Sequence, residues 1–429
     1  MPFLREGSDT LAGSHHTDRM ICLERPRHRL AAIAVGTLAG LSVVLADGAN
    51  AETDLGTQTL EALEQRVAEI DSELNSLASF SLQSGVGRVG YRSAPHDAAD
   101  VTEWIAVDLD QPRRIDQIVL VPALWRDTQT GFRSDAFPAA FRAIAETPGG
   151  RGPVVLASFD EGDALTPRIA PLVVDVGPVE VSSVKIEATR LSSRAWDGRF
   201  LLQLAEILLF DGRENVALQQ SVRQSSPEHD EGEARHKDYM VDGFLPYLMD
   251  AAEGAQSVAF VSGVGIGDQP RLILELGESA TIEGLHLHTV DVSDTVPQAT
   301  STEFAMPRHL RVEVADDAAF SNAVTLLDER FPTIYETGPI VARRVPATRG
   351  RFVRLTALEP FINEYSQIPG SQMGFAEIEI FAAGHNIALG RPVTAAFTPD
   401  SPDRSLAALT DGRNLYGHIL PTREWMGQL

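Results

Sequence analysis

Two histidines, His286 and His288, stand two residues apart in a run where apolar and polar residues alternate. In an extended strand such residues point to the same side, so the two imidazoles could hold a metal ion together. A zinc site needs at least three protein ligands, and no third ligand is apparent nearby in the sequence. A solvent-facing pair is therefore the preferred interpretation, and the metal site is the alternative.

Motifs that indicate an enzyme are missing from the sequence. It contains no G-x-S-x-G nucleophile elbow, no H-E-x-x-H zinc motif and no phosphate-binding P-loop. Gly263, Gly265 and Gly267 precede a predicted strand, whereas a dinucleotide-binding loop joins a strand to a helix. Carboxylates are plentiful, but their spacing marks out no pair for glycoside hydrolysis. We therefore expect no catalytic residues within this sequence.

From about residue 84 the hydrophobic pattern has the two-residue period of β-strands. Clusters of Gly, Pro, Asp and Asn separate the strands, as turns do. Alternation leaves one face polar, which argues against a parallel α/β sheet buried on both faces. The pattern predicts an all-β protein, built as a β-sandwich or jelly roll. The predicted strands are 104–109, 115–121, 181–188, 272–276, 282–288, 310–315 and 352–357.

The sequence repeats itself once, at a spacing of about 170 residues. The stretch AEILLFDGRENVALQQSV at 205–222 returns as AEIEIFAAGHNIALGRPV at 376–393. Upstream, VDLDQPRRIDQIVLV at 107–121 corresponds to LELGESATIEGLHLH at 274–288. A duplicated domain is the simplest explanation, so the function should be sought in the repeated unit.

The composition limits the range of partners. With 36 basic and 60 acidic residues the net charge is −24, so the field around the protein repels phosphate backbones and anionic lipids. Nucleic acid is therefore not expected as a partner. The 429 residues, 43% of them hydrophobic, are enough for two or three domains with packed cores.

The N-terminal region has the three parts of a secretory signal peptide. A basic cluster at 25–29 precedes an apolar run at 30–46, and an A-x-A cleavage site ends at Ala51. The alternative is an uncleaved membrane anchor, although the run is shorter than the ~20 residues of a usual span. The only cysteine, Cys22, would leave with the signal peptide, and translation starts at either Met1 or Met20. We expect an exported protein, either periplasmic or extracellular.

Residues 60–77 follow the heptad pattern of an amphipathic helix. About three heptads are present, which is short for a stable coiled coil. The helix either pairs with a second copy of the chain or docks on the first sandwich. The apolar positions are Leu60, Leu63, Val67, Ile70, Leu74 and Leu77.

Several motifs, in this order, resemble the discoidin domain, also called the coagulation factor 5/8 type C domain. They are WIAVDLDQPRRIDQIVL at 104–120, the AEI strands, the NVAL and NIALGRPV segments, and the later Asp-Gly pairs. The resemblance covers most of residues 84–384. It implies two tandem galactose-binding-like jelly-roll β-sandwiches, preceded by the short amphipathic helix.

The resemblance divides the chain into five parts. The last part repeats the opening of the second copy and then stops. About 45 residues cannot bury a core alone. This part either packs on the second sandwich or, as we prefer, belongs to a domain that continues past Leu429. The parts are a signal peptide at 1–51, the helix and linker at 52–83, sandwich one at 84–213, sandwich two at 214–384, and the opening of a third unit at 385–429.

Many discoidin-type sugar binders hold a structural calcium ion, so the resemblance implies a calcium site here. Its ligands in the second copy would be the carboxylates of Asp242 and Glu377, together with main-chain carbonyls. The first copy has Glu206, with Asp97 or Asp100 as the nearest second carboxylate. Alternatively, Asp-Gly is a plain turn and the glutamates are surface residues.

In this family, ligands bind to loops at one end of the sandwich, where aromatic rings stack on sugar faces and arginines bind hydroxyls. The resemblance therefore implies binding loops at 124–137 and 194–200 in the first copy and at 361–372 in the second. Alternatively, these aromatic rings plug the ends of the barrel. The expected ligand-binding residues are Trp125, Arg126, Phe132, Arg133, Arg194, Trp196, Phe361 and Tyr365.

Three functions are compatible with these features. The preferred one is non-catalytic binding of a glycan or cell-surface polysaccharide by an exported bacterial protein. The second is the sensory ectodomain of a longer membrane signalling protein, such as a sensor histidine kinase. The third is an accessory binding region of an extracellular enzyme. The sequence that follows Leu429 would distinguish them.

Overall fold

The computed structural model is almost entirely β-structure, with two α-helices, α1 (Leu60–Ser76) and α3 (Thr422–Gln428), in the described residues. The predicted signal peptide lies outside those residues. No helix among them is both long and apolar enough to span a bilayer. The described residues are 59–76, 80–82, 90–127, 131–150, 152–166, 169–227, 235–245, 247–249, 259–290, 305–331, 340–364, 366–414 and 417–429.

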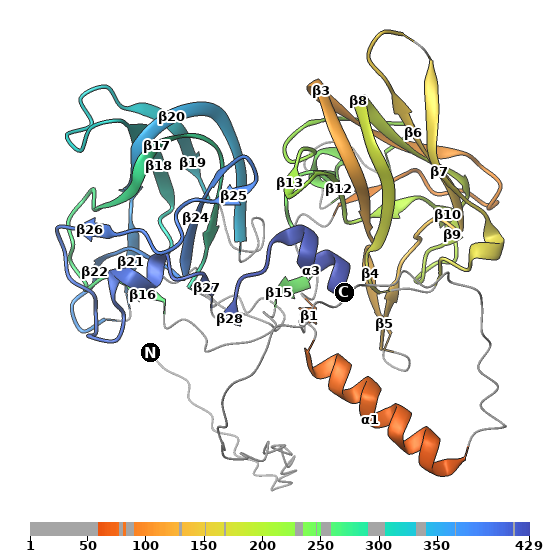
Figure 1. Ribbon diagram of the computed structural model, residues 1–429, viewed down its shortest axis with the longest axis horizontal. Coiled ribbons are helices and arrows are strands. Elements are labelled where there is room, and N and C mark those ends of the chain that lie inside the picture. Colours follow the sequence, from red (N-terminus) through yellow and green to blue (C-terminus); the bar gives the residue numbers. More distant parts are fainter. Residues whose placement is uncertain are drawn as a thin grey trace, which may run out of the picture. The chain divides into compact units, whose positions relative to one another are not determined.

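The first sandwich is one antiparallel sheet in the order β13-β12-β3-β8-β6-β7, with β14 paired to the other half of β3 (Figure 1). Its longest strands, β3 and β8, carry β-bulges at which their pairing shifts register. Bulges bend a strand, so the two halves of β3 can serve opposite layers. The strands are β3 (Glu103–Val121), β6 (Ala140–Glu146), β7 (Pro153–Phe159), β8 (Leu172–Arg190), β12 (Glu206–Asp211), β13 (Glu214–Asn215) and β14 (Ser221–Gln224).

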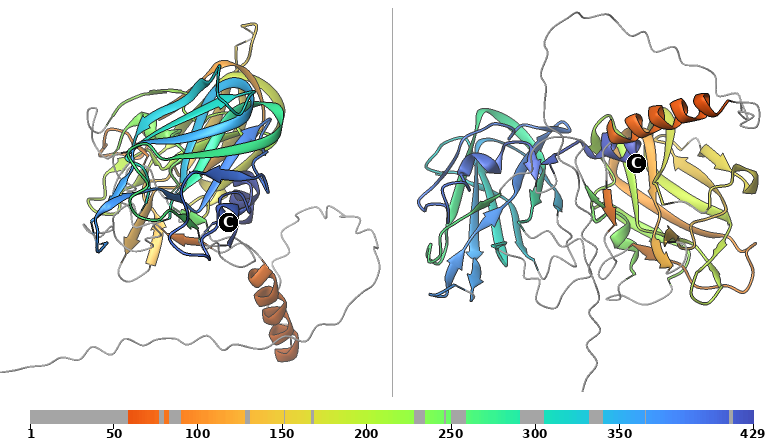
Figure 2. Two further views of the ribbon diagram at one scale, coloured as in Figure 1. Left: turned by 90° about the vertical axis from the view of Figure 1, so that its left-hand side faces the viewer. Right: turned by 90° about the horizontal axis from the view of Figure 1, so that it is seen from below.

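The second sandwich repeats this topology strand for strand. Its order is β19-β18-β20-β17-β24-β25, with β26 paired to β17. Its strands are the green-to-blue arrows in Figure 2. Both are antiparallel β-sandwiches, so the all-β class and the two tandem sandwiches predicted from the sequence are confirmed. The strands are β17 (Arg271–His288), β18 (His309–Ala315), β19 (Val324–Arg330), β20 (Ile340–Glu359), β24 (Glu377–Ala382), β25 (His385–Asn386) and β26 (Val393–Ala395).

Each sandwich has its own apolar core, formed by the alternate residues of its strands. Ile105 and Val107 begin the inward-facing series of β3, and Leu272 and Leu274 begin that of β17. All four side chains are fully buried. The predicted strands all lie within observed ones, because alternation with a period of two directly sets which side chains face the core.

Short strands and 3₁₀ turns close the ends of the sandwiches. The strands are β1 (Phe80–Leu82), β2 (Tyr91–Arg92), β4 (Leu124–Asp127), β5 (Gly131–Ser134), β9 (Ser192–Ser193), β10 (Phe200–Leu201), β11 (Gln203–Leu204), β15 (Tyr247–Met249), β16 (Phe260–Val261), β21 (Phe361–Asn363), β22 (Gly370–Gln372), β23 (Gly374–Phe375), β27 (Arg413–Asn414) and β28 (Gly417–His418). The turns are η2 (Glu161–Asp163), η3 (Lys237–Met240) and η4 (Leu406–Leu409).

The strand pairing does not follow the predicted boundary at 213/214. Residues 214–224 form β13 and β14, which pair with β12 and β3 of the first sheet. Residues 385–395 likewise form β25 and β26, which pair with β24 and β17 of the second. Each sandwich is thus completed by the segment that follows it. The segment 385–414, expected to open a third unit, packs on the second sandwich.

Near the C-terminal end the chain forms the short helix α3. Trp425 and Met426 are fully buried in an apolar cluster with Val119, Leu208 and Phe210, which project from the outer face of the first sheet. The guanidinium of Arg423 donates to the Asp116 carboxylate at 2.6 Å. A seven-residue helix is too short to be stable alone, so these contacts keep it helical.

Candidate functional site

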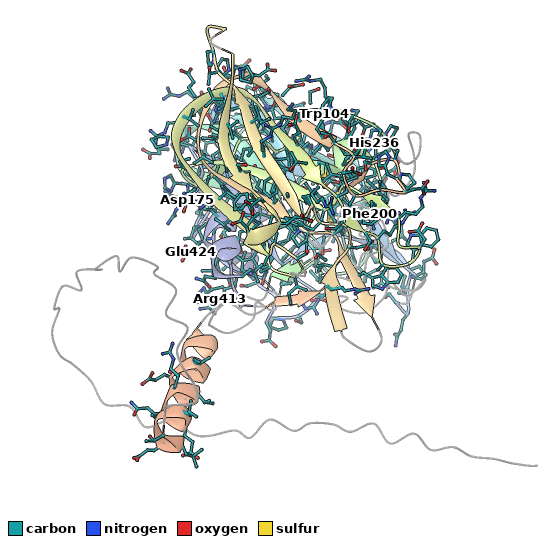
Figure 3. All side chains as sticks on the ribbon, turned by 90° about the vertical axis from the view of Figure 1, so that its right-hand side faces the viewer. Trp104, Asp175, Phe200, His236, Arg413 and Glu424 are labelled. Atoms are coloured by element: carbon teal, nitrogen blue, oxygen red, sulfur yellow. The ribbon has the colours of Figure 1, made fainter. Side chains whose placement is uncertain are left out.

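An exposed tryptophan dominates one loop of the first sandwich. Trp196 exposes 62% of its surface between β9 and β10, the latter starting at Phe200, which Figure 3 labels. The Arg194 guanidinium carbon lies 4.5 Å from the centre of the indole ring, a cation–π contact. Arg194 itself is buried and forms two hydrogen bonds to the Asp197 carboxylate, at 2.9 and 2.6 Å. These bonds lower the pKa of Asp197 to about 2, although partial burial opposes the shift.

Arg194 was expected to bind the ligand directly. Because its side chain is only 3% exposed and one edge of its guanidinium, Nε and one Nη, faces Asp197, we interpret it as a support for the ring of Trp196. Trp196 therefore has a fixed orientation before any ligand arrives. A pre-ordered aromatic side chain loses little conformational entropy on binding.

A buried aspartate ties this loop to the β4–β5 hairpin. Asp135 directly follows β5, and its main-chain N–H donates to the carbonyl of Ala123, just before β4. Its carboxylate accepts a hydrogen bond of 2.8 Å from the main-chain N–H of Ala195. The Gln203 amide, which also binds Arg92, is 3.4 Å from the same carboxylate. Asp135 thus brings the two predicted binding loops of this sandwich together.

The β4–β5 hairpin presents the other predicted aromatic residue. Trp125 lies opposite Arg133 in the strand pairing, and both side chains are exposed. Directly opposite residues share one face, so the indole and the guanidinium are neighbours. Arg126 pairs with Phe132 along the backbone, but their side chains lie outside the described residues. The hairpin therefore offers the combination of ring and cation expected from the sequence.

A histidine that the sequence analysis missed lies at the same end. The Nε2 of His96 is 2.6 Å from a carboxylate oxygen of Glu103, and the main chain of His96 pairs with that of Phe200. Glu103 is buried and also accepts hydrogen bonds from the hydroxyls of Ser225 and Ser226. The imidazole is held through one nitrogen, which leaves Nδ1 for a ligand. No local motif signals this group, since Ser225 and Ser226 follow Glu103 by about 120 residues.

The second sandwich does not repeat this arrangement. Phe361, expected to stack on a ligand, is buried with only 5% of its surface exposed. Asn363 bonds to the side chain of Gln372 at 2.7 Å, and Tyr365 lies outside the described residues. Where the first sandwich has Arg92 and Gln203, equivalent strand positions carry Val261 and Gly374. Among the described residues, the group of exposed aromatic and polar side chains lies at the end of the first sandwich.

Each sandwich carries a buried glutamate beside an Asp-Gly turn. In the first, Glu206 accepts a hydrogen bond of 2.9 Å from the Gly243 N–H, next to Asp242. In the second, Glu377 accepts one of 3.0 Å from the Gly412 N–H, next to Asp411. This differs from the predicted site, in which Asp242 and Glu377 were partners. The reason is the strand pairing, which returns each Asp-Gly segment to the sandwich preceding it.

Both glutamates are poorly compensated as anions. Among the described residues, no group pairs with the second carboxylate oxygen of Glu206 or of Glu377. Burial raises the pKa of Glu206 well above its usual range, and the charge of Asp242 adds to the rise. Burial likewise raises the pKa of Glu377 to about 9, against the opposing hydrogen bond from Gly412.

The donor set fits a calcium ion at each of these two places. A buried carboxylate oxygen without a partner, beside a second carboxylate, is what a hard cation would satisfy. Within the described residues, however, no cluster contains three or more Asp, Glu, His or Cys side chains suited to a metal. Main-chain carbonyls and water would have to complete the six to eight oxygens that calcium takes.

The two histidines of β17 do not form the solvent-facing pair that the sequence analysis preferred. His288 is 2% exposed and His286 is partly exposed. His288 Nε2 and His286 Nδ1 lie 2.9 and 3.3 Å from the same Glu379 oxygen. Burial alone would raise the pKa of Glu379, but the hydrogen bonds from both imidazoles lower it to about 2. The carboxylate that binds this pair follows them in sequence by about 90 residues, so the sequence pattern did not reveal it.

Comparisons with known proteins give remote structural matches. No family model matches the sequence, and no curated protein is found as a relative. A fragment from Bacteroides thetaiotaomicron described as a chitobiase is 22% identical, with a TM-score of 0.21, over 28% of this chain and 63% of that fragment. The chain thus spans less than two thirds of that relative.

Two further matches are sugar-binding proteins by their descriptions. The CBM32-1 and CBM32-2 domains of ZmpB from Clostridium perfringens are 10% identical, with a TM-score of 0.22, over 76% of this chain and 98% of theirs. A fucolectin from striped bass serum is 12% identical, with a TM-score of 0.22, over 66% and 83%. At these values the likeness does not assign a ligand to the chain.

Proposed function

We propose that the first sandwich binds a glycan, without catalysis, through the end that carries Trp196 and the β4–β5 hairpin. The observation that carries the proposal is the exposed Trp196 ring, which packs against the buried guanidinium of Arg194, itself paired with Asp197. A fixed, exposed aromatic face suits the apolar face of a sugar ring. The resemblance of the sequence motifs to the discoidin family favours the same ligand class.

The polar residues around Trp196 would select among sugars. His96 offers a ring nitrogen, Arg133 offers a guanidinium, and Trp125 adds a second aromatic surface on the hairpin that Asp135 connects to the Trp196 loop. Such groups hydrogen-bond hydroxyls in fixed directions. We further propose that structural calcium binds at Glu206 with Asp242 and at Glu377 with Asp411, where it would stabilise the fold rather than contact the sugar.

The setting we propose is the exterior or periplasm of a bacterial cell, because the N-terminal residues carry the three parts of a signal peptide. The roles as a sensory ectodomain or as an accessory region of an enzyme use the same binding end. These two roles differ in the further domain to which the binding sandwiches would be joined. Sequencing the gene beyond the codon for Leu429 would distinguish them.

Replacing Trp196 by alanine is expected to weaken glycan binding at least tenfold. Removing a central aromatic contact typically costs more than about 1.4 kcal/mol of binding free energy. The measurement is a glycan array with residues 52–429, followed by calorimetric titration of the best sugar. Trp125→Ala tests whether the hairpin belongs to the same site.

The control variant is Ile368→Ala, which truncates an exposed apolar side chain of the second sandwich and should bind as wild type. Thermal unfolding of each variant shows that the fold is retained. Unchanged affinity of both tryptophan variants would place the site elsewhere, and a folded protein that binds no glycan would favour a protein-binding sensory role.

We also expect the chain to self-associate through α1. Leu60, Val67 and Ile70 expose 73%, 57% and 41% of their surfaces along one heptad stripe, and such a stripe suits a second copy of the helix. Light scattering of residues 52–429 should give a dimer at micromolar concentration, and Val67→Asp a monomer. Glu64→Gln, a change outside the stripe, is the control. A wild-type monomer at all concentrations would exclude this role for α1.

A further inference from the structure

The two sandwiches differ most clearly on the outer face of one strand pair. In the first sandwich, Val119 of β3 lies directly opposite Leu208 of β12. In the second, His286 of β17 lies opposite Glu379 of β24 at the same two positions. Val121 is replaced in the same way by His288. Three neighbouring apolar residues of one copy thus correspond to a hydrogen-bonded His-His-Glu triad in the other.

The apolar version of this face needs no ligand, because α3 covers it. Trp425 and Met426 pack on Val119, Leu208 and Phe210, and all five side chains are buried. The triad, in contrast, puts polar groups where the fold itself requires only apolar contacts. Burying such groups is unfavourable unless each finds a hydrogen-bond partner.

The triad leaves ring nitrogens for a further partner. One Glu379 oxygen faces both rings, so the nitrogen of each ring that faces it carries the proton. In a neutral imidazole the other nitrogen is then a lone-pair acceptor. For His288 this is Nδ1, which is buried and has no partner among the described residues. A carboxylate behind an imidazole fixes its tautomer and orientation, as in many binding sites.

A cavity of about 520 Å³ adjoins the triad. This volume lies within the range of roughly 300–1,000 Å³ that is usual for small-molecule sites. Much of its lining is apolar, including Leu208, Ile340, Phe381 and Trp425. Of the three arginines in the lining, Arg343 binds Glu329 and Arg344 binds Asp110. The third, Arg213, shares the lining with the carboxylates of Glu214, Glu283, Glu379 and Asp411, so the cavity has no excess of positive charge. The cavity therefore suits a largely apolar, uncharged molecule better than an anion.

We propose that this cavity binds a small, mainly apolar molecule that carries one hydroxyl or N–H donor, with the donor directed to the imidazoles of His286 and His288. Phe381, whose ring centre lies 4.5 Å from that of His286, supplies an aromatic surface beside the donor position. The ligand class is therefore phenol-like. The site is independent of the glycan-binding end of the first sandwich.

The test compares phenol with toluene, a molecule of nearly the same shape without the donor, by calorimetric titration of residues 52–429. Wild type is expected to bind phenol at least tenfold more tightly than toluene. The triple variant His286→Val, His288→Val, Glu379→Leu carries the residues that the first sandwich has at these positions. The triple variant should bind toluene more tightly than phenol, since an unpaired hydroxyl is disfavoured in an apolar cavity.

The matched control is His309→Val, which removes a His–carboxylate pair with Asp328 that does not line the cavity. It should keep the wild-type preference for phenol. If the triple variant does not fold, the ring nitrogen NMR signals of His286 and His288 in wild type decide, because phenol should shift them and toluene should not. Equal binding of the two probes, or binding of neither, would overturn the proposal.

Discussion

Without calcium, the protein is expected to become less stable as the pH rises from about 5 to 9. Glu377 is responsible, because burial raises its pKa to about 9 in the folded protein from an ordinary value near 4.5. Between these two values the folded protein keeps the proton and the unfolded chain has released it. Each rise in pH therefore favours unfolding, by up to about 1.4 kcal/mol per pH unit.

Other buried carboxyls do not reverse this trend. The pKa values of Glu206 and Asp411 are also raised, chiefly by burial, so they act in the same direction. Glu379, with its pKa lowered to about 2, stabilises the fold above pH 4.5 and loses that contribution only as the pH falls toward 2. The titration of Glu379 therefore lies outside the range from pH 5 to pH 9.

The measurement is the free energy of unfolding by urea at pH 5, 7 and 9, in EDTA, for wild type and Glu377→Gln. The neutral amide has nearly the shape of the protonated acid, so the variant should be less sensitive to pH. Glu206→Gln is the matched variant in the first sandwich. Parallel pH profiles of wild type and both variants would contradict the account of these glutamates as protonated, buried groups.

In wild type, calcium should oppose the loss of stability that is expected at high pH. A bound cation stabilises the ionised carboxylates, so added calcium should raise the melting temperature most at pH 8 to 9, where its ligands are most readily deprotonated. Glu377→Gln and Glu206→Gln should each lose part of that gain. If calcium leaves the melting temperature of wild type unchanged at pH 8, the two Asp-Gly turns are structural only.

Replacing Trp425 by alanine is expected to destabilise the protein by about 3–5 kcal/mol, the range for removing a fully buried large aromatic side chain. Trp425 is 0% exposed in the cluster that joins α3 to the first sheet. The loss should also unfold α3, which lacks a side-chain hydrogen bond at its N-terminus. Hydrogen exchange should then quicken in β12 and in the second half of β3.

The control for this variant is Trp196→Ala, which removes the same side chain from an exposed loop. It should change the unfolding free energy by less than about 0.5 kcal/mol. A Trp425→Ala protein within about 1 kcal/mol of wild type would mean that α3 contributes little to the fold. Urea unfolding followed by circular dichroism distinguishes these outcomes.

The strands and the all-β class could be predicted because they depend on local alternation. Ile105, Val107 and Leu109 face the core in the observed order, and the duplication is visible wherever such positions recur. The exposure of Trp196 followed from its polar loop. The burial of Arg194 could also have been inferred from the sequence, because Asp197 stands three residues later and can pair with it. A single arginine–aspartate pair, however, has no distinctive sequence pattern.

Long-range pairing could not be predicted in the same way. The segment at 214–224 is compatible with either neighbouring sandwich, and only its hydrogen bonds to β3 and β12 decide between them. That choice also decides which Asp-Gly turn lies beside Glu206 and which lies beside Glu377. The role of His288 was missed for a related reason, because alternation places a residue on the outer face of a sheet without showing what covers that face.

The completion of each sandwich by the segment that follows it has a consequence for synthesis and for the exchange of domains. A chain of which only the residues up to 213 have emerged, from the ribosome or from an export channel, lacks β14, the partner of half of β3, and lacks the Gly243 N–H that donates to Glu206. The first sandwich can therefore be completed only after residue 243 has emerged. A gene segment that encodes the complete first sandwich must therefore extend past the Asp-Gly pair at 242–243. A fusion made at residue 213 would leave an open sheet edge, which promotes aggregation.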